Sequence, residues 1–177
     1  MTVLPNFPQE DQIWKWLHDV PDPEVPVVSV VDLGIVREVF WQGDCLEVVV
    51  TPTYSGCPAT GVIAMDIETA LRDHGVEKLK ITNRLSPAWS TDWMSDTGRE
   101  KLRAYGIAPP VGKVTSCGAN SGETVAGSFS PAKPIGLNCP RCDSTNTRCV
   151  SWFGSTACKA SYQCNDCLEP FDYFKCI

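Results

Sequence analysis

Apolar residues near the start of the chain recur at a helical period. Within residues 9–18, Ile13, Trp14 and Leu17 fall on one side of a helix, and most other positions are polar. Pro21 follows, and proline cannot continue a helix because it lacks the backbone N–H and clashes with the preceding turn. The pattern therefore predicts a short amphipathic helix that ends before Pro21.

A stretch of β-branched and apolar residues then predicts a β-hairpin. Such residues dominate two segments, 33–41 and 45–51, and they favour strands. The residues between the segments, Gln42, Gly43 and Asp44, have the composition of a tight turn. We expect the two strands to pair antiparallel.

The next segment combines a helical period with an alternating one. Residues 59–73 carry apolar side chains at helical spacing, and Gly75 is placed to end that helix. Residues 77–83 alternate between apolar and polar positions, as in a strand. A strand–helix–strand crossover is right-handed and lays its helix across one face of the sheet. The pattern predicts an α+β fold, with a small mixed β-sheet packed against helices.

A further helix is predicted over 96–105, with Ser95 as its N-cap and Gly106 at its end. This helix would complete a first domain over residues 1–108. Residues 109–135 are rich in Pro, Gly, Ser and Ala and contain few apolar residues. A segment that cannot bury a core is typical of a flexible linker.

Charge and composition exclude several classes of protein. The net charge is −6, and residues 1–108 hold sixteen Asp and Glu against nine Lys and Arg, so nucleic-acid binding lacks a basic surface. No apolar run approaches the roughly 20 residues that span a bilayer. The first residues do not resemble a secretory signal. We therefore expect a cytoplasmic protein whose ten cysteines stay reduced.

Two Cys-x-x-Cys pairs near the end of the chain carry the strongest chemical signal. They are Cys139 with Cys142 and Cys164 with Cys167, within a third segment over 136–177. Two intervening residues allow a tight turn that directs both sulfurs at one point, and a second such turn completes a tetrahedron with metal–sulfur distances of about 2.3 Å. The spacing predicts a four-cysteine β-ribbon that binds structural Zn²⁺.

The alternatives to a zinc ribbon are an iron centre like that of rubredoxin, which uses similar pairs, and disulfide bonds. Residues 150–153 and 161–163 have the composition of strands. Three aromatic residues near the end, Phe171, Tyr173 and Phe174, are predicted to cover the resulting sheet.

Cys57 is the candidate reactive thiol of the first domain. It follows Thr53 and precedes Pro58, in a segment that links a predicted strand to a predicted helix. If Pro58 occupies the first helical position, Cys57 is the N-cap, where the helix dipole favours the thiolate. The alternative is that Cys57 only fills space.

The remaining cysteines and the carboxylates give weaker signals. Cys158 lies in a stretch of glycine, hydroxyl and small residues, where it is either an auxiliary metal or redox group or a buried thiol. Asp22 and Glu24 lie beside prolines, where carboxylates more often stabilise turns than bind metal. Four cysteines have no informative spacing: Cys45, Cys117, Cys149 and Cys176.

Two tryptophans, Trp89 and Trp93, lie in a proline-bounded segment. They would either dock a partner or fill the core. The chain has no Ser/His/Asp arrangement or phosphate-binding glycine loop, so we expect no catalytic residue.

The chain contains six distinctive segments: 22–26, 32–36, 51–58, 87–94, 153–160 and 169–175. Together they resemble the PaaD family, also called PaaJ, which joins an iron–sulfur cluster assembly domain like that of SufT proteins to a zinc ribbon. One departure is Ala88, where the family often has proline.

This resemblance implies an accessory component of the phenylacetyl-CoA ring-epoxidising monooxygenase. Its partners would be the oxygenase and reductase subunits, and it would assist the insertion of iron or an iron–sulfur cluster. The reactive cysteine of the family corresponds to Cys57, with Thr53 beside it. A transient iron or cluster site at Cys57, shared in a homodimer, is one form of this hypothesis. The alternatives are a structural adaptor and a thiol enzyme that depends on Cys57.

Overall fold

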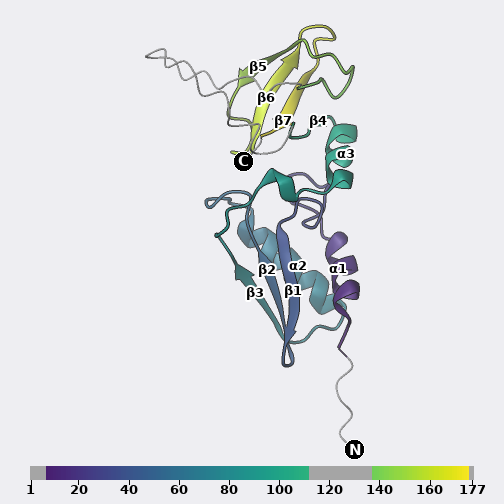
Figure 1. Ribbon diagram of the computed structural model, residues 1–177, viewed down its shortest axis with the longest axis vertical. Coiled ribbons are helices and arrows are strands. Elements are labelled where there is room, and N and C mark those ends of the chain that lie inside the picture. The colour runs from purple at the N-terminus through teal and green to yellow at the C-terminus, as the bar shows by residue number, and fades with distance from the viewer. Residues whose placement is uncertain (1–6, 112–136, 176–177) are drawn as a thin grey trace, which may run out of the picture. The chain divides into compact units, whose positions relative to one another are not determined.

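The computed structural model describes residues 7–111 and 137–175 (Figure 1). The chain divides into two compact units, Met1–Ala88 and Trp89–Ile177. No helix within the described ranges has the length and apolar content needed to cross a bilayer.

The first unit contains a three-stranded mixed sheet with two helices. Its elements are α1 (Glu10–His18), β1 (Val36–Gln42), β2 (Cys45–Val50), α2 (Thr60–Asp73) and β3 (Leu79–Asn83). In the sheet order β1-β2-β3, β1 pairs antiparallel with β2, and β2 pairs parallel with β3. The predicted hairpin, the strand–helix–strand unit and the α+β class are confirmed.

Both helices of the first unit bury one apolar face. Ile13 and Leu17 of α1 are buried, as are Ile63, Ile67 and Leu71 of α2. These positions match the helical spacing in the sequence, and Figure 1 shows both helices alongside the sheet. The sheet contributes the buried residues of its central strand: Leu46, Val48, Val49 and Val50.

The strand predicted from residue 33 begins three residues later. The backbone turns here, because Leu33 N–H donates to Ser29 O at 3.0 Å and Gly34 adopts a φ of +67°. A positive φ is compatible with glycine but not with a regular strand. This segment has the composition of a strand but forms a turn, and β1 begins only at Val36.

The second unit contains a short 3-10 turn, one helix and a four-stranded sheet. Its elements are η1 (Thr91–Trp93), α3 (Asp96–Tyr105), β4 (Ile107–Ala108), β5 (Thr147–Ser151), β6 (Lys159–Cys164) and β7 (Pro170–Phe174). The predicted caps of α3 are confirmed: Ser95 Oγ accepts from Gly98 N–H at 2.9 Å, and Gly106 has a φ of +96°. The strand predicted over 150–153 lies earlier, because Thr147 already pairs with Cys164.

The boundary between the two units differs from the predicted end of the first domain at residue 108. The sheet order is β4-β7-β6-β5, and β4 pairs parallel with β7 through Ile107 with Asp172 and Ala108 with Tyr173. Residues 89–108 therefore belong to the same compact unit as the ribbon. The predicted linker over 109–135 lies almost entirely outside the described residues and stays a prediction.

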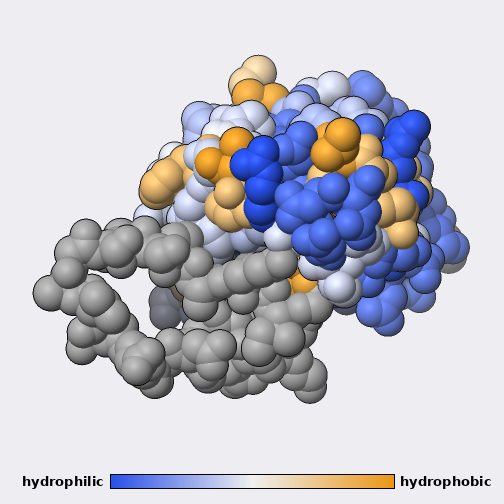
Figure 2. Space-filling view, turned by 90° about the horizontal axis from the view of Figure 1, so that it is seen from above, coloured by the Kyte–Doolittle hydropathy of each residue, from blue (hydrophilic) through white to orange (hydrophobic). Residues whose placement is uncertain are grey.

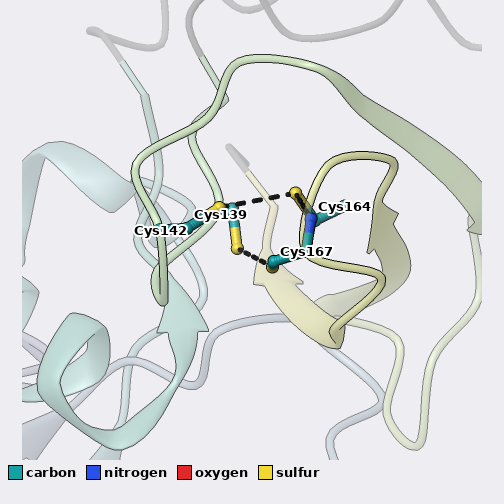
Figure 3. Close-up of side chains that lie close together, drawn as sticks. All are labelled: Cys139, Cys142, Cys164 and Cys167. Carbon is teal, nitrogen blue, oxygen red and sulfur yellow. Dashed lines mark hydrogen bonds between the residues drawn. The ribbon is translucent and has the colours of Figure 1, made fainter.

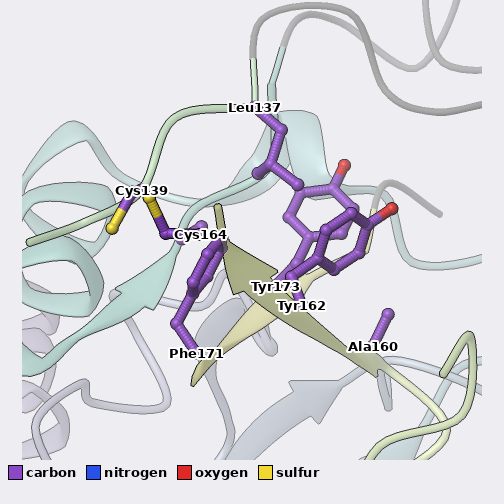
Figure 4. Packing of buried hydrophobic residues seen from close by; sticks show 8 residues of the cluster. Leu137, Cys139, Ala160, Tyr162, Cys164, Phe171 and Tyr173 are labelled. Atoms are coloured by element: carbon purple, nitrogen blue, oxygen red, sulfur yellow. The ribbon is translucent and has the colours of Figure 1, made fainter. Parts of the chain in front are cut away.

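Aromatic side chains form much of the core of the second unit (Figure 4). The Tyr162 ring meets Tyr173 edge-on with centroids 5.7 Å apart, and Phe171 lies 6.0 Å from Tyr162. Trp89 is only 3 % exposed, and its ring lies 6.1 Å from Phe174. The prediction that three aromatic residues cover the sheet is confirmed, and Trp89 fills the core instead of presenting its ring to a partner.

Exposed apolar residues of the second unit are few. Figure 2 shows small hydrophobic patches separated by hydrophilic side chains on the face that it presents. Within the described residues of this unit, the exposed large apolar side chains are Tyr105, Val150, Phe153 and Leu168.

Candidate metal centre and reactive thiol

The four predicted ribbon cysteines converge on one point (Figure 3). Cys139 and Cys142 precede β5, Cys164 is the last residue of β6, and Cys167 lies in the turn before β7. Their Sγ atoms all lie within 4.8 Å of one another. Cys139 Sγ is 3.7 Å from Cys167 Sγ, and Cys142 Sγ is 3.6 Å from Cys164 Sγ.

These distances fit a tetrahedral metal ion. Four sulfurs bound at about 2.3 Å in a tetrahedron lie about 3.8 Å apart, close to the 3.6 and 3.7 Å observed. A disulfide would bring two sulfurs to about 2.05 Å, and all four cysteines are free. The disulfide alternative is therefore excluded for the ribbon. Four thiolates in a tetrahedron suit zinc or iron.

The local backbone shapes each cysteine pair. Asp143 and Leu168, the residues that directly follow the two pairs, have φ values of 62° and 65°. This left-handed conformation closes each turn, and Asp143 N–H donates to Cys139 O at 2.9 Å. In the second turn, Cys167 N–H donates to Cys164 Sγ at 3.5 Å. That amide is the main cause that lowers the pKa of Cys164 to about 7, which favours the thiolate that metal binding requires.

A polar network joins the two cysteine turns. The Asp166 carboxylate accepts hydrogen bonds from the Ser144 hydroxyl and, at 2.7 Å, from the Asn146 side chain. Asn165 N–H donates to Asn146 O at 2.8 Å, and the Asn165 side chain donates to Asn146 Oδ1 at 2.9 Å. This network was not predicted from the sequence, because Ser144 and Asn146 follow the first pair whereas Asp166 lies within the second, so the two pairs share no polar pattern. The network holds the turns in register for one ion.

Replacement of Asp166 by alanine is expected to weaken zinc binding by about 10- to 100-fold, because residues that orient metal ligands contribute on this scale. Competition with a chromophoric chelator would measure the zinc affinity. Asp172→Ala is the matched control, since Asp172 lies on β7 of the same sheet and outside the network. Equal affinities for the Asp166 and Asp172 variants would contradict a role for the network.

Cys57 lies in the turn that leads into α2, but it is not the N-cap. The helix begins at Thr60 with Ala59 as its N-cap, and no side chain caps it. The Cys57 carbonyl instead accepts from Thr60 N–H at 3.2 Å and from Thr60 Oγ1 at 2.9 Å, so a separate turn precedes the helix. The predicted capping position is wrong. Cys57 precedes the first turn of α2, and the influence of a helix dipole is confined to that turn.

The Cys57 side chain is nevertheless partly exposed. Within the part of the chain that the structure describes, no hydrogen bond to its thiol is found. Thr53, predicted to lie beside it, is buried. The Cys57 thiol is therefore accessible to a ligand or partner and has no hydrogen-bond partner among those residues.

The carboxylates of the first unit stabilise turns. Asp22 Oδ1 accepts from Glu24 N–H at 3.0 Å and from Val25 N–H at 2.8 Å. Asp32 Oδ2 accepts from Ser29 N–H at 3.1 Å in the following turn. This is the structural role that proline-flanked carboxylates usually have. Among the described residues, neither Asp22 nor Glu24 belongs to a group that could hold a metal ion.

Cys158 is a buried thiol outside the metal centre. Its Sγ lies 3.0 Å from Thr156 Oγ1, and it is not part of the four-cysteine group. Of the cysteines without informative spacing, Cys45 is partly exposed and Cys149 is exposed. Cys117 and Cys176 lie outside the described residues.

Two family models match this chain, one in each part. The model described as "Iron-sulfur cluster assembly protein" matches residues 10–81. The model described as "PaaD zinc beta ribbon domain" matches residues 123–175, which include the four cysteines. The second match indicates zinc as the ion for which the tetrahedral site is built.

Three relatives cover different shares of this chain. One subunit of the "Putative 1,2-phenylacetyl-CoA epoxidase" of Escherichia coli is 47 % identical over 176 residues, which cover 99 % of this chain and 97 % of that protein. An "Fe-S protein maturation auxiliary factor" of Porphyromonas gingivalis is 36 % identical over 95 residues, 52 % of this chain and 90 % of the relative.

The third relative is the "Fe-S protein maturation auxiliary factor YitW" of Bacillus subtilis. It is 33 % identical over 88 residues, 49 % of this chain and 85 % of the relative. The two maturation factors thus match about half of the chain, whereas the Escherichia coli relative matches both parts. Because an iron–sulfur cluster assembly domain is followed in the sequence by a four-cysteine ribbon, and because the Escherichia coli relative matches almost the whole chain, the chain belongs to the PaaD family of phenylacetyl-CoA epoxidase subunits.

Proposed function

We propose that this chain is a non-catalytic accessory component of a phenylacetyl-CoA epoxidase and assists the insertion of iron or an iron–sulfur cluster into that complex. The observation that carries the proposal is that the Cys57 thiol is partly exposed and is not part of the group of four ribbon cysteines. This thiol can serve as one metal ligand, but the residues that the structure describes do not complete a metal site around it.

An incomplete site suits delivery better than storage. Tetrahedral iron or a cluster needs several soft ligands. Among the described residues, the ribbon cysteines form the only group of three or more potential ligands. Cys57 would therefore supply one thiolate, and the other ligands would come from a second copy of the chain or from the client. A metal held by such a shared site can leave when the partner dissociates.

The ribbon, in contrast, forms a complete metal site. Its four ligands come from one chain, and they surround a single point. Such a site retains its ion and contributes the binding free energy to folding. In this proposal the ribbon zinc is structural, and any iron is transient at Cys57.

The named relatives support both halves of the proposal. The near-complete match to one subunit of an epoxidase points to the oxygenase and reductase subunits as partners. The matches of about half the chain to two Fe–S maturation factors point to metal insertion.

The two alternatives have less support. A thiol enzyme needs a general base within hydrogen-bond reach of its nucleophile, and no such contact of the Cys57 thiol is found among the described residues. Of the two tryptophans through which an adaptor would dock, Trp89 is buried and Trp93 is partly exposed, which leaves one ring of that segment for a partner.

Oxygenase complexes purified from strains with and without this chain would test the proposal. We expect complexes made without the chain to assemble but to contain less iron or fewer iron–sulfur clusters than complexes made with it. Metal analysis and size-exclusion chromatography measure the two properties separately. Failed assembly with a normal metal content would instead favour the adaptor.

A further inference from the structure

We infer that an aromatic surface on the first unit docks a basic, extended segment of a partner protein. The inference rests on the proposed function in one respect, because it takes the partner to be another component of the epoxidase. The aromatic surface consists of Phe7, Trp16, Trp41 and His74. Their rings form two stacks: Phe7 on Trp41, with centroids 4.4 Å apart, and Trp16 on His74, with centroids 4.2 Å apart.

Three hollows adjoin these stacks, at Phe7 and Trp41 of the first stack and at Trp16 of the second. Their volumes are about 340, 480 and 380 Å³, and Phe7 and Pro8 line all three. Trp41 lines the first and third, and Trp16 lines the second. Adjacent hollows that share lining residues accommodate successive side chains of an extended segment better than one compact ligand. Partly exposed aromatic side chains are frequent energetic centres of protein interfaces.

The surface is held in shape before any partner binds. Trp41 Nε1–H donates to Pro8 O at 3.0 Å, which fixes the segment before α1 against the end of β1. Because both stacks already have their ring geometry, little side-chain entropy is lost on binding.

The charge of the hollows selects the partner. Their lining includes four carboxylates, Glu10, Asp11, Asp44 and Glu77, and two ammonium groups, Lys15 and Lys78. The lining residues that the structure describes thus carry a net charge of −2, and Lys78 is paired with Asp44. Arginine or lysine side chains would meet both this negative charge and the aromatic faces, which attract cations. An acidic segment would be repelled.

The position of the surface separates docking from chemistry. Gly75 and Val76, which line a hollow, follow α2, whereas Cys57 precedes it. A helix of 14 residues is about 21 Å long at about 1.5 Å per residue. A partner bound at the aromatic surface therefore leaves the Cys57 thiol accessible.

Binding of the purified oxygenase and reductase subunits to variants of this chain tests the inference. We expect Trp41→Ala to weaken binding of one of them by at least about tenfold, the scale of an interface hot spot. We expect the double variant Glu10→Gln/Asp11→Asn to weaken it several-fold and to reduce its dependence on NaCl concentration. Met65→Ala is the matched control, since Met65 is 68 % exposed on α2 of the same unit and lies outside the hollows.

Circular dichroism would establish that each variant is folded, and the charge variant decides the matter if Trp41→Ala is not. Wild-type affinity of the folded aromatic and charge variants would overturn the inference, as would the absence of binding by the wild type. The metal content of the oxygenase is measured in parallel. Docking of the folded variants at wild-type affinity, with metal insertion still dependent on the chain, refutes only the aromatic surface, whereas metal content independent of the chain refutes the proposed function.

Discussion

Replacement of Cys164 by serine is expected to abolish metal binding by the ribbon and to unfold its sheet. Cys164 is fully buried, ends β6 and belongs to the core cluster of the second unit. A serine hydroxyl is a poor zinc ligand, so the ribbon would lose most of a binding free energy of about 10–16 kcal/mol, the range for structural zinc sites. A sheet of this size buries too little apolar surface to replace that amount.

Metal analysis of the purified Cys164→Ser protein would measure the loss of zinc, and hydrogen exchange would locate the unfolding. We expect fast exchange in β5, β6 and β7, with protection retained in α2 of the first unit. The control is Cys149→Ser, because Cys149 is an exposed cysteine on β5 that is not a ligand. A Cys164→Ser protein that kept both its zinc and its protected sheet would refute the four-cysteine site.

Local patterns predicted the first unit well because each element carries its own signal. The helical spacing of Ile63, Ile67 and Leu71 reflects the face that α2 buries. The errors lie at the ends of elements, where one backbone angle or hydrogen bond decides the boundary. Gly34 delays β1, and the turn at Cys57 delays α2, although composition alone favoured an earlier start for both.

The convergence of the four cysteines could be predicted from their spacing, because each Cys-x-x-Cys turn is a local structure that directs both sulfurs at one point. The boundary of the second unit could not be predicted from the sequence. The strand β4 has two residues and carries no periodic pattern, so its place beside β7 depends on a tertiary contact. The burial of Trp89 against Phe174 is likewise a contact between distant segments. Only the folded chain reveals such contacts.

Replacement of Cys57 by serine is expected to leave the fold and the ribbon zinc unchanged but to lower metal transfer to the oxygenase. Serine keeps the size of the side chain and removes the soft thiolate that would bind iron. The turn around Cys57 is held by its backbone carbonyl, which the substitution retains. We expect the rate of metal transfer to fall by at least about tenfold, the scale on which altered metal sites lose affinity.

Transfer from the chain reconstituted with iron and sulfide to metal-depleted oxygenase would be followed by the metal content of the re-isolated oxygenase. Cys45→Ser is the matched control, because Cys45 is a partly exposed cysteine on β2 of the same unit. Transfer by Cys57→Ser at the wild-type rate would remove Cys57 from the mechanism. A reduced rate in both variants would point instead to unspecific thiol ligation. A defect confined to Cys57→Ser, with ribbon zinc and thermal stability unaltered, would separate a transient ligand from a structural one, since loss of a structural ligand also destabilises its unit.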